Sequence, residues 1–395
     1  MKRRVPKLSF PIGPQHPALK EPEQLQITVD GEVVVDADIR IGYIHRSIER
    51  SCQDRTYIQD LYLCERVCGI CSNAHTLCFA TTVEKLAGVE VPRRAQYVRM
   101  LMHELERIHS HMLWLGVAGH EVGFETLFMY VWRDRETVQD LLEMLSGNRG
   151  HYAMTTLGGV RHDLTPEMID KCREGLKHLR ERAEYYADIA TTEATFLKRA
   201  SEVGVVSGDR CAELGATGPT LRGSGVGFDV REYFPYSGYD EIEWEVKTSE
   251  LCDVLGRTLV RVLEVIEACN IGMRVLDDLP DGEVQAKVPR KIPEGEAVGR
   301  VEAQRGELIY YIKSNGTDKP ERVKIRTPTL SNIPSGVEMV KGGYIADITI
   351  SFASIDPCFS CTDRTVVLTD SNNGDSRQIT WPDLVNLSRT AGKGQ

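Results

Sequence analysis

The spacing of apolar residues changes twice along the chain and predicts three regions. Between residues 8 and 41 apolar and polar residues alternate around Asp30-Gly31, which predicts a β-hairpin. From about residue 46 the apolar residues recur at steps of three and four, which predicts helices. After Pro289 the alternation returns around Asn315-Gly316 and predicts a second hairpin. The expected fold class is therefore α+β, with a large central helical bundle and a β-rich region formed by the N- and C-terminal segments.

Three apolar stripes identify long helices in the central region. The first follows Pro92, the second begins at Thr165-Pro166, where the threonine is expected to cap the helix, and the third covers residues 251–269. Between the second and third helices, the glycine-rich residues 204–227 predict a close-packed loop whose backbone approaches another part of the chain.

These patterns divide the chain into four expected units. Residues 1–45 form an N-terminal β region, residues 46–285 a helical core domain, and residues 286–364 a C-terminal β region. Residues 365–395 are polar and lack a sustained period, so we expect them to form a C-terminal extension.

The candidate chemistry lies in two cysteine pairs of C-x-x-C spacing, Cys68/Cys71 and Cys358/Cys361. Each pair can close on one soft metal, and four sulfurs from two turns make a complete site for zinc, nickel or an iron–sulfur unit. Since the pairs lie near opposite ends of the chain, the fold must bring these ends together. We expect the metal site at that junction.

The three metals differ in how they use four cysteines. A structural zinc site usually draws its ligands from short local hairpins, and an iron–sulfur cluster from one short segment. A catalytic nickel site needs soft thiolates and an open position, which four cysteines provide if two of them bridge to a second metal. Arg66, Arg305 and Arg364, in or near the two motifs, would offset negative charge or hold anionic ligands, which favours nickel.

Charge and cysteine content exclude some classes of function and favour others. The formal net charge of −10 argues against nucleic-acid binding. No apolar run reaches the roughly 18 residues of a membrane span. Eleven cysteines without an export signal indicate reduced thiols and metal ligation.

Six stretches of the chain form one recognisable set: Gly13-Pro14-Gln15-His16-Pro17, Gly42-Tyr43-Ile44-His45-Arg46, Glu65-Arg66-Val67-Cys68-Gly69-Ile70-Cys71, Gly218-Pro219-Thr220-Leu221-Arg222-Gly223-Ser224-Gly225, Arg305-Gly306-Glu307-Leu308 and Asp356-Pro357-Cys358-Phe359-Ser360-Cys361. Together they resemble the large, nickel-carrying subunit of [NiFe] hydrogenases, in the membrane-bound, energy-converting group related to respiratory complex I. The first and fourth stretches are shared with the quinone-site subunit of complex I, of 49 kDa type, which lacks the four cysteines. Their presence here favours nickel over quinone.

The resemblance implies a ligand set. Cys68 and Cys358 match terminal nickel ligands, and Cys71 and Cys361 match ligands that bridge nickel to an iron carrying CO and two cyanides. The implied cofactor is therefore a Ni-Fe centre with CO and cyanide on iron.

The resemblance also implies roles for four residues around the metals. Arg305 matches the arginine above the open position, near one cyanide, and Thr329 matches a hydrogen-bond donor to the other. Glu21 matches the carboxylate that exchanges protons with a terminal cysteine. His75 completes a C-x-x-C-x-x-x-H pattern and is expected to lie beside the ligands.

One departure from the family pattern concerns magnesium. Many relatives place a histidine three residues after the last cysteine, where it helps to hold magnesium with a glutamate that matches Glu49. Here that position is Arg364, which cannot ligate magnesium, and we expect no magnesium there. Residues 365–395 match a C-terminal extension that a dedicated protease removes after nickel insertion.

The function implied is reversible H2 oxidation and proton reduction. The partners implied are a small iron–sulfur subunit similar to the complex I 20 kDa subunit, further iron–sulfur and ion-translocating membrane subunits, ferredoxin or a similar carrier, and a maturation protease with nickel-insertion proteins. The protein would lie peripherally on the cytoplasmic side of the membrane. Two alternatives stay open, a complex I-like quinone-site subunit and a zinc-stapled scaffold without catalysis.

Overall fold

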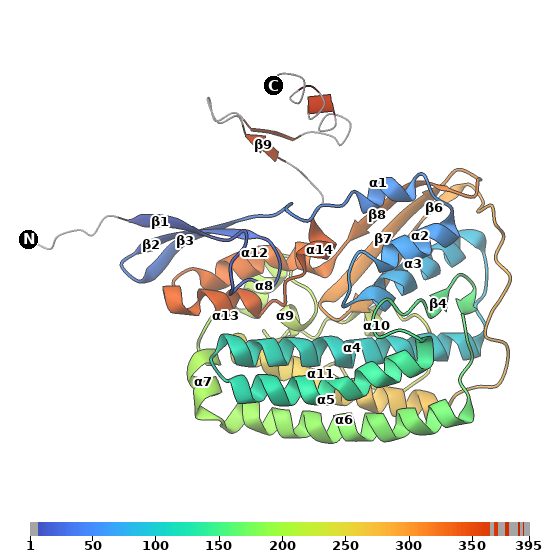
Figure 1. Cartoon of the computed structure of the whole chain (residues 1–395), viewed down its shortest axis with the longest axis horizontal. Helices are drawn as coiled ribbons and strands as arrows, with labels where there is room; N and C mark the ends of the chain where they lie inside the picture. The colour runs from blue at the N-terminus through green and yellow to red at the C-terminus, as the bar shows by residue number, and fades with distance from the viewer. Residues whose placement is uncertain (1–6, 364–366, 370–375, 379–385, 388–389, 391–395) are drawn as a thin grey trace, which may run out of the picture.

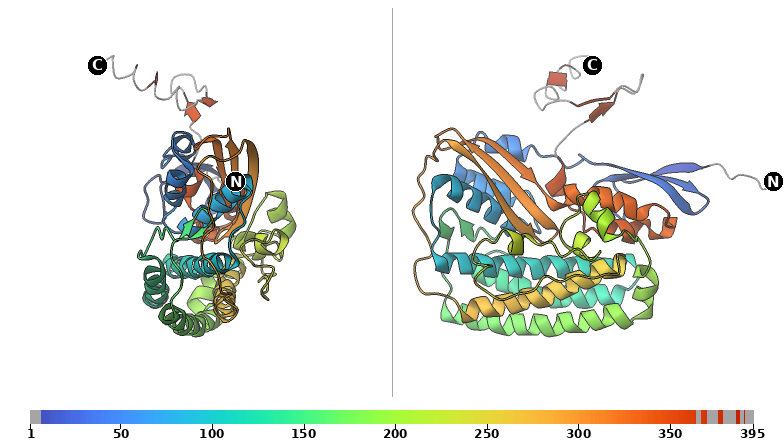
Figure 2. Two further views of the ribbon diagram at one scale, coloured as in Figure 1. Left: turned by 90° about the vertical axis from the view of Figure 1, so that its right-hand side faces the viewer. Right: turned by 180° about the vertical axis from the view of Figure 1, so that it is seen from behind.

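Long helices form one layer of the molecule, and the sheets and short helices that carry the cysteine motifs form a second layer against it (Figures 1 and 2). The computed structural model describes residues 7–363, 367–369, 376–378, 386–387 and 390. The α+β class expected from the sequence is confirmed, because helices and antiparallel sheets both contribute to the core.

The helical layer consists of α4 (Arg93–Glu121), α5 (Glu125–Ser146), α6 (Pro166–Thr192) and α11 (Val254–Asp277). Helix α4 contacts α5 and α11, and α6 contacts the same two helices. The predicted stripes form the largest apolar core, to which all four helices contribute. Thr165 caps α6 as predicted, accepting a hydrogen bond from Met168 N at 3.3 Å.

An antiparallel N-terminal sheet contains β1 (Leu8–Ile12), β2 (Gln24–Asp30) and β3 (Val33–Arg40). The predicted hairpin joins β2 to β3, and the alternate side chains of β2 are buried. Residues 13–23 connect β1 to β2 without regular structure, and this β1–β2 loop carries Glu21.

A second antiparallel sheet, β6 (Gly295–Ala303), β7 (Gly306–Ser314) and β8 (Pro320–Arg326), contains the other predicted hairpin. Strands β6 and β7 pack against α3 (Ser72–Ala87), the helix that follows the first cysteine pair. The tight turn between β6 and β7 is Gln304-Arg305, so the sheet places Arg305 at its end.

The predicted β region at the C-terminal side differs from the structure in two ways. After β8 the chain forms helices, namely α12 (Pro328–Val340), η1 (Ile345–Asp347), α13 (Ile348–Ala353) and α14 (Phe359–Thr362). The apolar spacing Ile333, Val337, Val340 is helical, and Pro328 occupies the first turn of α12, where proline is favoured. The terminal segments also form two separate sheets, with α12 in contact with both β3 and β7.

The shorter elements connect these parts of the chain. They are α1 (Ile48–Cys52), α2 (Tyr57–Glu65), β4 (Thr155–Thr156), β5 (Gly159–Val160), α7 (Ala194–Ala200), α8 (Gly208–Glu213), α9 (Pro219–Arg222) and α10 (Val230–Tyr233). Within the expected extension the structure describes an antiparallel pair, β9 (Val367–Thr369) and β10 (Ser376–Gln378). In the part of the chain that the structure describes, none of the helices combines the length and the apolar character that crossing a membrane requires.

Arg222, at the end of α9, is fully buried and joins the glycine-rich loop to both layers. Its Nε donates to Glu264 Oε1 of α11 at 2.8 Å, and its Nη1 donates to Glu302 Oε1 of β6 at 2.7 Å. Buried charges are tolerated when they are paired and hydrogen-bonded. This arginine therefore fixes the loop between the helical layer and the second sheet.

The glycine-rich loop makes the close approach that its composition predicts. Gly218 has φ +67°, and a Cβ there would lie 2.4 Å from Gly306 Cα and 2.5 Å from the carbonyl oxygen of Arg305. The loop backbone thus lies directly against the turn that carries Arg305.

Replacing Gly218 with alanine should therefore destabilise the protein more than the same change at Gly215. Gly215 has φ +76° with no neighbouring atom within 4 Å, so Gly215→Ala should cost only the backbone strain of about 1–2 kcal/mol. Gly218→Ala adds overpacking, for a total of about 2–5 kcal/mol. Urea unfolding of both variants measures the difference, and equal losses would contradict this packing argument.

Candidate metal centre

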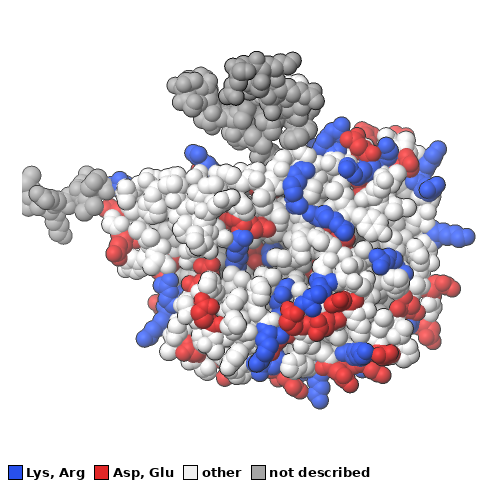
Figure 3. Space-filling view, in the orientation of Figure 1, with Lys and Arg blue, Asp and Glu red and all other residues white. Residues whose placement is uncertain are grey.

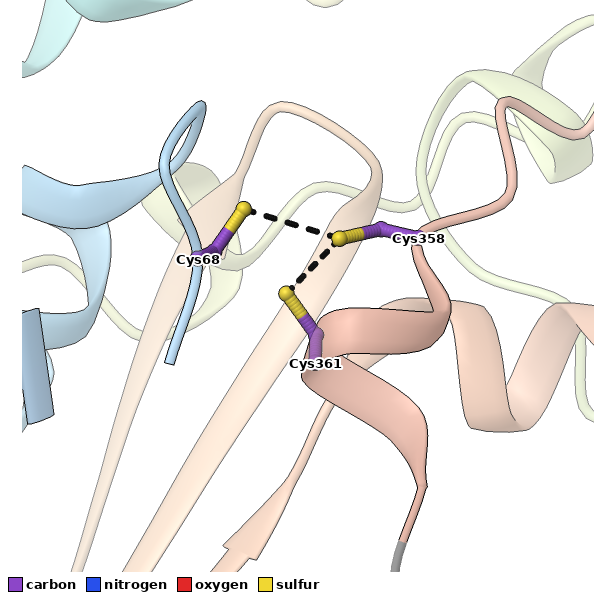
Figure 4. Close-up of side chains that lie close together, drawn as sticks. All are labelled: Cys68, Cys358 and Cys361. Carbon is purple, nitrogen blue, oxygen red and sulfur yellow. Dashed lines mark hydrogen bonds between the residues drawn. The ribbon is translucent and has the colours of Figure 1, made fainter. Parts of the chain in front are cut away.

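The four cysteine sulfurs lie close together in the protein interior, and Figure 4 draws three of them, those of Cys68, Cys358 and Cys361. Cys68 Sγ is 3.5 Å from Cys358 Sγ, and Cys71 Sγ is 3.7 Å from Cys361 Sγ. Within the second pair, Cys358 Sγ and Cys361 Sγ are 2.9 Å apart. Four sulfurs bound tetrahedrally at about 2.3 Å from one metal would be about 3.8 Å apart. The two separations between the pairs are close to that size, whereas the separation within the second pair is shorter.

Each pair is held at the start of a helix. Cys68 lies in the turn after α2, and Cys71 is the N-cap of α3. Cys358 is the N-cap of α14, and Cys361 lies within that helix. The backbone N–H groups of Ile70 and Cys71 both donate to Cys68 Sγ at 3.3 Å, which favours a thiolate there.

The four thiols influence one another's protonation. Hydrogen bonds from neighbouring thiols, chiefly that of Cys358, hold the pKa of Cys68 well below its ordinary value. The pKa of Cys358 is also lowered, chiefly by Cys361. In contrast, the hydrogen bond with Cys358 raises the pKa of Cys71, and burial raises that of Cys361. Two thiols thus deprotonate readily, and a metal ion would have to displace the remaining protons.

The donor set fits a thiophilic metal centre. None of the four cysteines forms a disulfide among the described residues, and buried sulfur suits zinc, nickel or iron and does not suit magnesium or calcium. The possible ligand atoms form two groups that share Cys361. One contains Cys68, Cys358 and Cys361, the other Cys71, His75 and Cys361, and within each group the atoms lie within 4.8 Å of one another.

Glu21 reaches the second cysteine pair from the β1–β2 loop. Its carboxylate accepts hydrogen bonds from Ser360 N at 2.9 Å, from Ser360 Oγ at 2.8 Å, and from Phe359 N. Ser360 Oγ also lies 3.2 Å from Cys358 Sγ, so this hydroxyl connects the thiol to the carboxylate. Burial, followed by the charge of Cys358, raises the pKa of Glu21 to about 7.

Arg305 lies buried beside the second motif. Its Nε donates to the carbonyl oxygen of Asp356 at 2.8 Å, and its Nη2 pairs with Asp356 Oδ1 at 3.0 Å. Its positive charge acts on the sulfurs of Cys358, Cys71 and Cys68. The turn between β6 and β7 thus places a fixed cation next to the sulfur cluster.

Thr329 and His75 also lie at the cluster. Thr329 Oγ1 accepts a hydrogen bond from Cys358 N at 3.1 Å. The Nδ1 atom of His75 lies 2.7 Å from the hydroxyl of Tyr310.

The two residues that bear on magnesium are Glu49 and Arg364. Glu49 Oε1 accepts a hydrogen bond from Ile325 N at 2.8 Å, whereas Arg364 lies outside the described residues.

Arg46 is a residue of the site that spacing arguments missed. Its Nη2 donates to the carbonyl oxygen of Val67 at 2.7 Å and to that of Ser360 at 2.9 Å, and its Nη1 donates to the carbonyl oxygen of Arg66 at 2.9 Å. One guanidinium therefore ties the two cysteine turns together. The signal in the sequence is its place in Gly42-Tyr43-Ile44-His45-Arg46, although no role follows from that motif alone.

Glu106 was missed for a different reason. It lies on α4, and its carboxylate accepts hydrogen bonds from Asn73 N at 2.6 Å and from Ala74 N at 2.9 Å, at the start of α3. It also accepts one from Gln304 Nε2 at 2.9 Å. A buried carboxylate that caps a distant helix leaves no local mark in the sequence.

Replacing Arg46 with methionine should loosen the contact between the two cysteine turns. Hydrogen bonds to a charged group contribute about 1.5–3 kcal/mol each, so we expect Cys358 and Cys361 of the metal-free chain to react with iodoacetamide about tenfold faster or more. Peptide mass spectrometry measures these rates. Arg50→Met is the matched control, because Arg50 is exposed, where it pairs with Asp54 and donates to Gln53. Unchanged rates in Arg46→Met would remove this role.

Two protein families match the chain. The family described as the 49 Kd subunit of respiratory-chain NADH dehydrogenase matches residues 121–292 and 288–364, and nickel-dependent hydrogenase matches residues 46–116. The hydrogenase match includes Cys68 and Cys71, and the 49 Kd match includes Cys358 and Cys361.

Curated relatives of both kinds cover nearly the whole chain. The membrane-bound hydrogenase subunit alpha of Pyrococcus furiosus is 39% identical over 96% of this chain and 92% of that protein. The carbon monoxide-induced hydrogenase of Rhodospirillum rubrum is 41% identical over 90% and 99%, respectively. A subunit of the NADH-quinone oxidoreductase of Dehalococcoides mccartyi is 37% identical over 89% and 97%.

A solved structure shares the fold. A chain of the membrane-bound sulfane sulfur reductase, an archaeal respiratory membrane complex, superimposes with a TM-score of 0.86 at 30% identity, covering 91% of this chain and 98% of that one. The sequence matches and the structural match agree with the resemblance drawn from the six stretches. The chain belongs to the family that unites the large subunits of energy-converting, membrane-bound [NiFe] hydrogenases with the 49 kDa-type subunit of respiratory NADH dehydrogenase.

Proposed function

We propose that this chain is the catalytic subunit of a membrane-associated [NiFe] hydrogenase that interconverts protons and H2. The observation that carries the proposal is the cluster of four buried cysteine sulfurs from two distant turns. The hydrogenase names of two relatives support it. The family also includes subunits of NADH-quinone oxidoreductases, so membership alone does not decide the activity.

Cys68 and Cys358 would be terminal nickel ligands, and Cys71 and Cys361 would bridge nickel to iron. Cys361 belongs to both groups of possible ligand atoms, as a bridging cysteine would. When bound, such a centre would supply the Lewis acid that polarises H2 and the redox chemistry that takes up its electrons. Arg305 and Thr329 would donate hydrogen bonds to the cyanides that we expect, with CO, on iron.

A proton path would start at the thiol of Cys358. Its proton would pass to the Ser360 hydroxyl, 3.2 Å away, while that hydroxyl gives its own proton to Glu21 over 2.8 Å. A carboxyl with a pKa of about 7 can accept and release a proton near neutral pH. Glu21 is therefore the group we expect to carry protons between the centre and the outside.

The partners we propose are those of an energy-converting complex. A small iron–sulfur subunit would pass electrons between this chain and ferredoxin or a similar carrier, and membrane subunits would translocate ions. Named relatives and the solved structure come from membrane complexes.

On the face drawn in Figure 3, charged side chains of both signs cover the helical layer, whereas few lie over the N-terminal sheet. Exposed Val33, Val35 and Tyr344 support contact with a partner there.

The alternative with specific support is a complex I-like quinone-site subunit, because the longer family match is to the 49 Kd subunit. Metal analysis and infrared absorption of the purified complex separate the proposals. We expect about one nickel and about one iron in this subunit, with CO and cyanide bands. Zinc alone would favour a scaffold, and a matured complex with neither metal nor bands would favour the quinone-site subunit.

Exchanging Glu21 for glutamine should stop most turnover while the metal centre is retained. Glutamine can accept the same N–H hydrogen bonds but cannot take up a proton, and we expect H2 evolution to fall about 10²–10⁴-fold. Nickel, iron and infrared bands should be unchanged. Glu174→Gln, an exposed change on α6, is the control. Near-normal H2 evolution by Glu21→Gln would exclude this residue from the proton path.

A further inference from the structure

A cluster of buried cations lies behind the second cysteine motif, and the proposed reaction does not use it. Trp114 of α4 is its centre. The Arg261 guanidinium of α11 lies 4.2 Å from the indole centroid, and Lys20 Nζ, from the β1–β2 loop, lies 5.7 Å from it. Trp114 and Arg261 are essentially inaccessible to solvent, and so is the Lys20 ammonium.

Both cations have unsatisfied donors. Arg261 Nη1 donates to the carbonyl oxygen of Arg257 at 3.0 Å, but Arg261 Nε and Nη2 have no hydrogen-bond partner among the described residues. Lys20 Nζ also has none among them. Leaving a buried charged donor unpaired costs several kcal/mol, so native proteins seldom leave such groups without a hydrogen-bond partner.

The neighbouring carboxylates do not fill these donors. Asp356 and Glu121 both act on Lys20, and Asp356 and Glu264 both act on Arg261. The Oδ1 atom of Asp356 pairs with Arg305 at 3.0 Å, and its Oδ2 has no partner among the described residues. The open donors of Lys20 and Arg261 therefore remain without an acceptor in the part of the chain that the structure describes.

We propose that Lys20 and Arg261 bind a small monovalent anion of chloride size against Trp114. A small anion can accept hydrogen bonds from the open donors of both cations at once, and its bond to each cation is charge-assisted. Because the open donors are enclosed, the site would admit a small ion and exclude a bulky one. The Lys20 ammonium can donate to the anion and to Asp356 Oδ2 at the same time, since it has three N–H groups.

Protonation of Lys20 supports the same site. Burial, together with the charges of Arg305 and Arg261, lowers its pKa to about 8, against the opposing effects of Asp356 and Glu121. A bound anion would stabilise the charged ammonium, so binding should be strong below pH 8. Above pH 8 the ammonium loses its proton, and the affinity should fall by up to about tenfold per pH unit.

The experiment is thermal unfolding of the full chain, without metal, as chloride replaces gluconate at constant ionic strength. We expect the Tm to rise with chloride and to saturate, because an ion that binds only the folded state shifts the equilibrium by mass action. Bromide should act in the same way, and its anomalous scattering in a crystal should place it between Lys20 Nζ and the Arg261 guanidinium. Equal Tm values in chloride and gluconate would overturn the proposal.

Variants test the residues. Lys20→Met should raise the dissociation constant for chloride at least tenfold. Arg261→Met should abolish the saturable rise of Tm with chloride. If Arg261→Met does not fold, Arg261→Lys, which keeps the charge but loses the planar fork, should weaken binding. Lys341→Met, at an exposed lysine, is the control and should bind as the unchanged chain does. A dissociation constant for chloride that stays unchanged in both Lys20→Met and Arg261→Lys would place the anion elsewhere. The assay needs no metal, so its outcome is independent of the hydrogenase proposal.

Discussion

The carbonyl oxygens of Val67 and Ser360 share a single donor, the guanidinium of Arg46. The sulfur cluster depends on this contact, because the helices that hold the two cysteine turns come from distant parts of the chain and this guanidinium bonds to both turns. Helix α3 holds one turn and α14 holds the other, and no sheet hydrogen bonds join these two helices. A planar guanidinium suits this task, since its donors point in fixed directions toward several carbonyl groups.

Paired buried charges hold the surroundings of the cluster. Arg222 joins the glycine-rich loop to Glu264 and Glu302, and the same loop lies against the turn that carries Arg305. Such pairs contribute little net stability, but a mismatch in them is costly, so they hold one arrangement against others. The helical layer thereby fixes Arg305 beside the sulfur cluster, although no continuous helix or strand of the described chain joins that layer to the cluster.

Local patterns predicted most of the fold. Period-two alternation and Asp30-Gly31 or Asn315-Gly316 located both hairpins, and Thr165-Pro166 located the start of α6. The helices after Pro328 were missed because they are mostly short and follow strands. C-x-x-C spacing identified the four sulfurs, whereas Arg46, Ser360 and Glu106 act through contacts between distant segments that a linear pattern does not encode. Lys20 was missed likewise, because the isolation of its ammonium is a property of packing.

The distance in sequence between the two cysteine turns also sets an order in time. Cys68 and Cys358 are 290 residues apart. At about 5–20 residues per second, a ribosome needs about 15–60 s to produce the second turn after the first has emerged. Throughout that interval the first turn offers only two of the four sulfurs. Insertion of the proposed metals into the complete centre would thus be a late event of biosynthesis, and whatever delivers them would have to wait for, or protect, a half-built site.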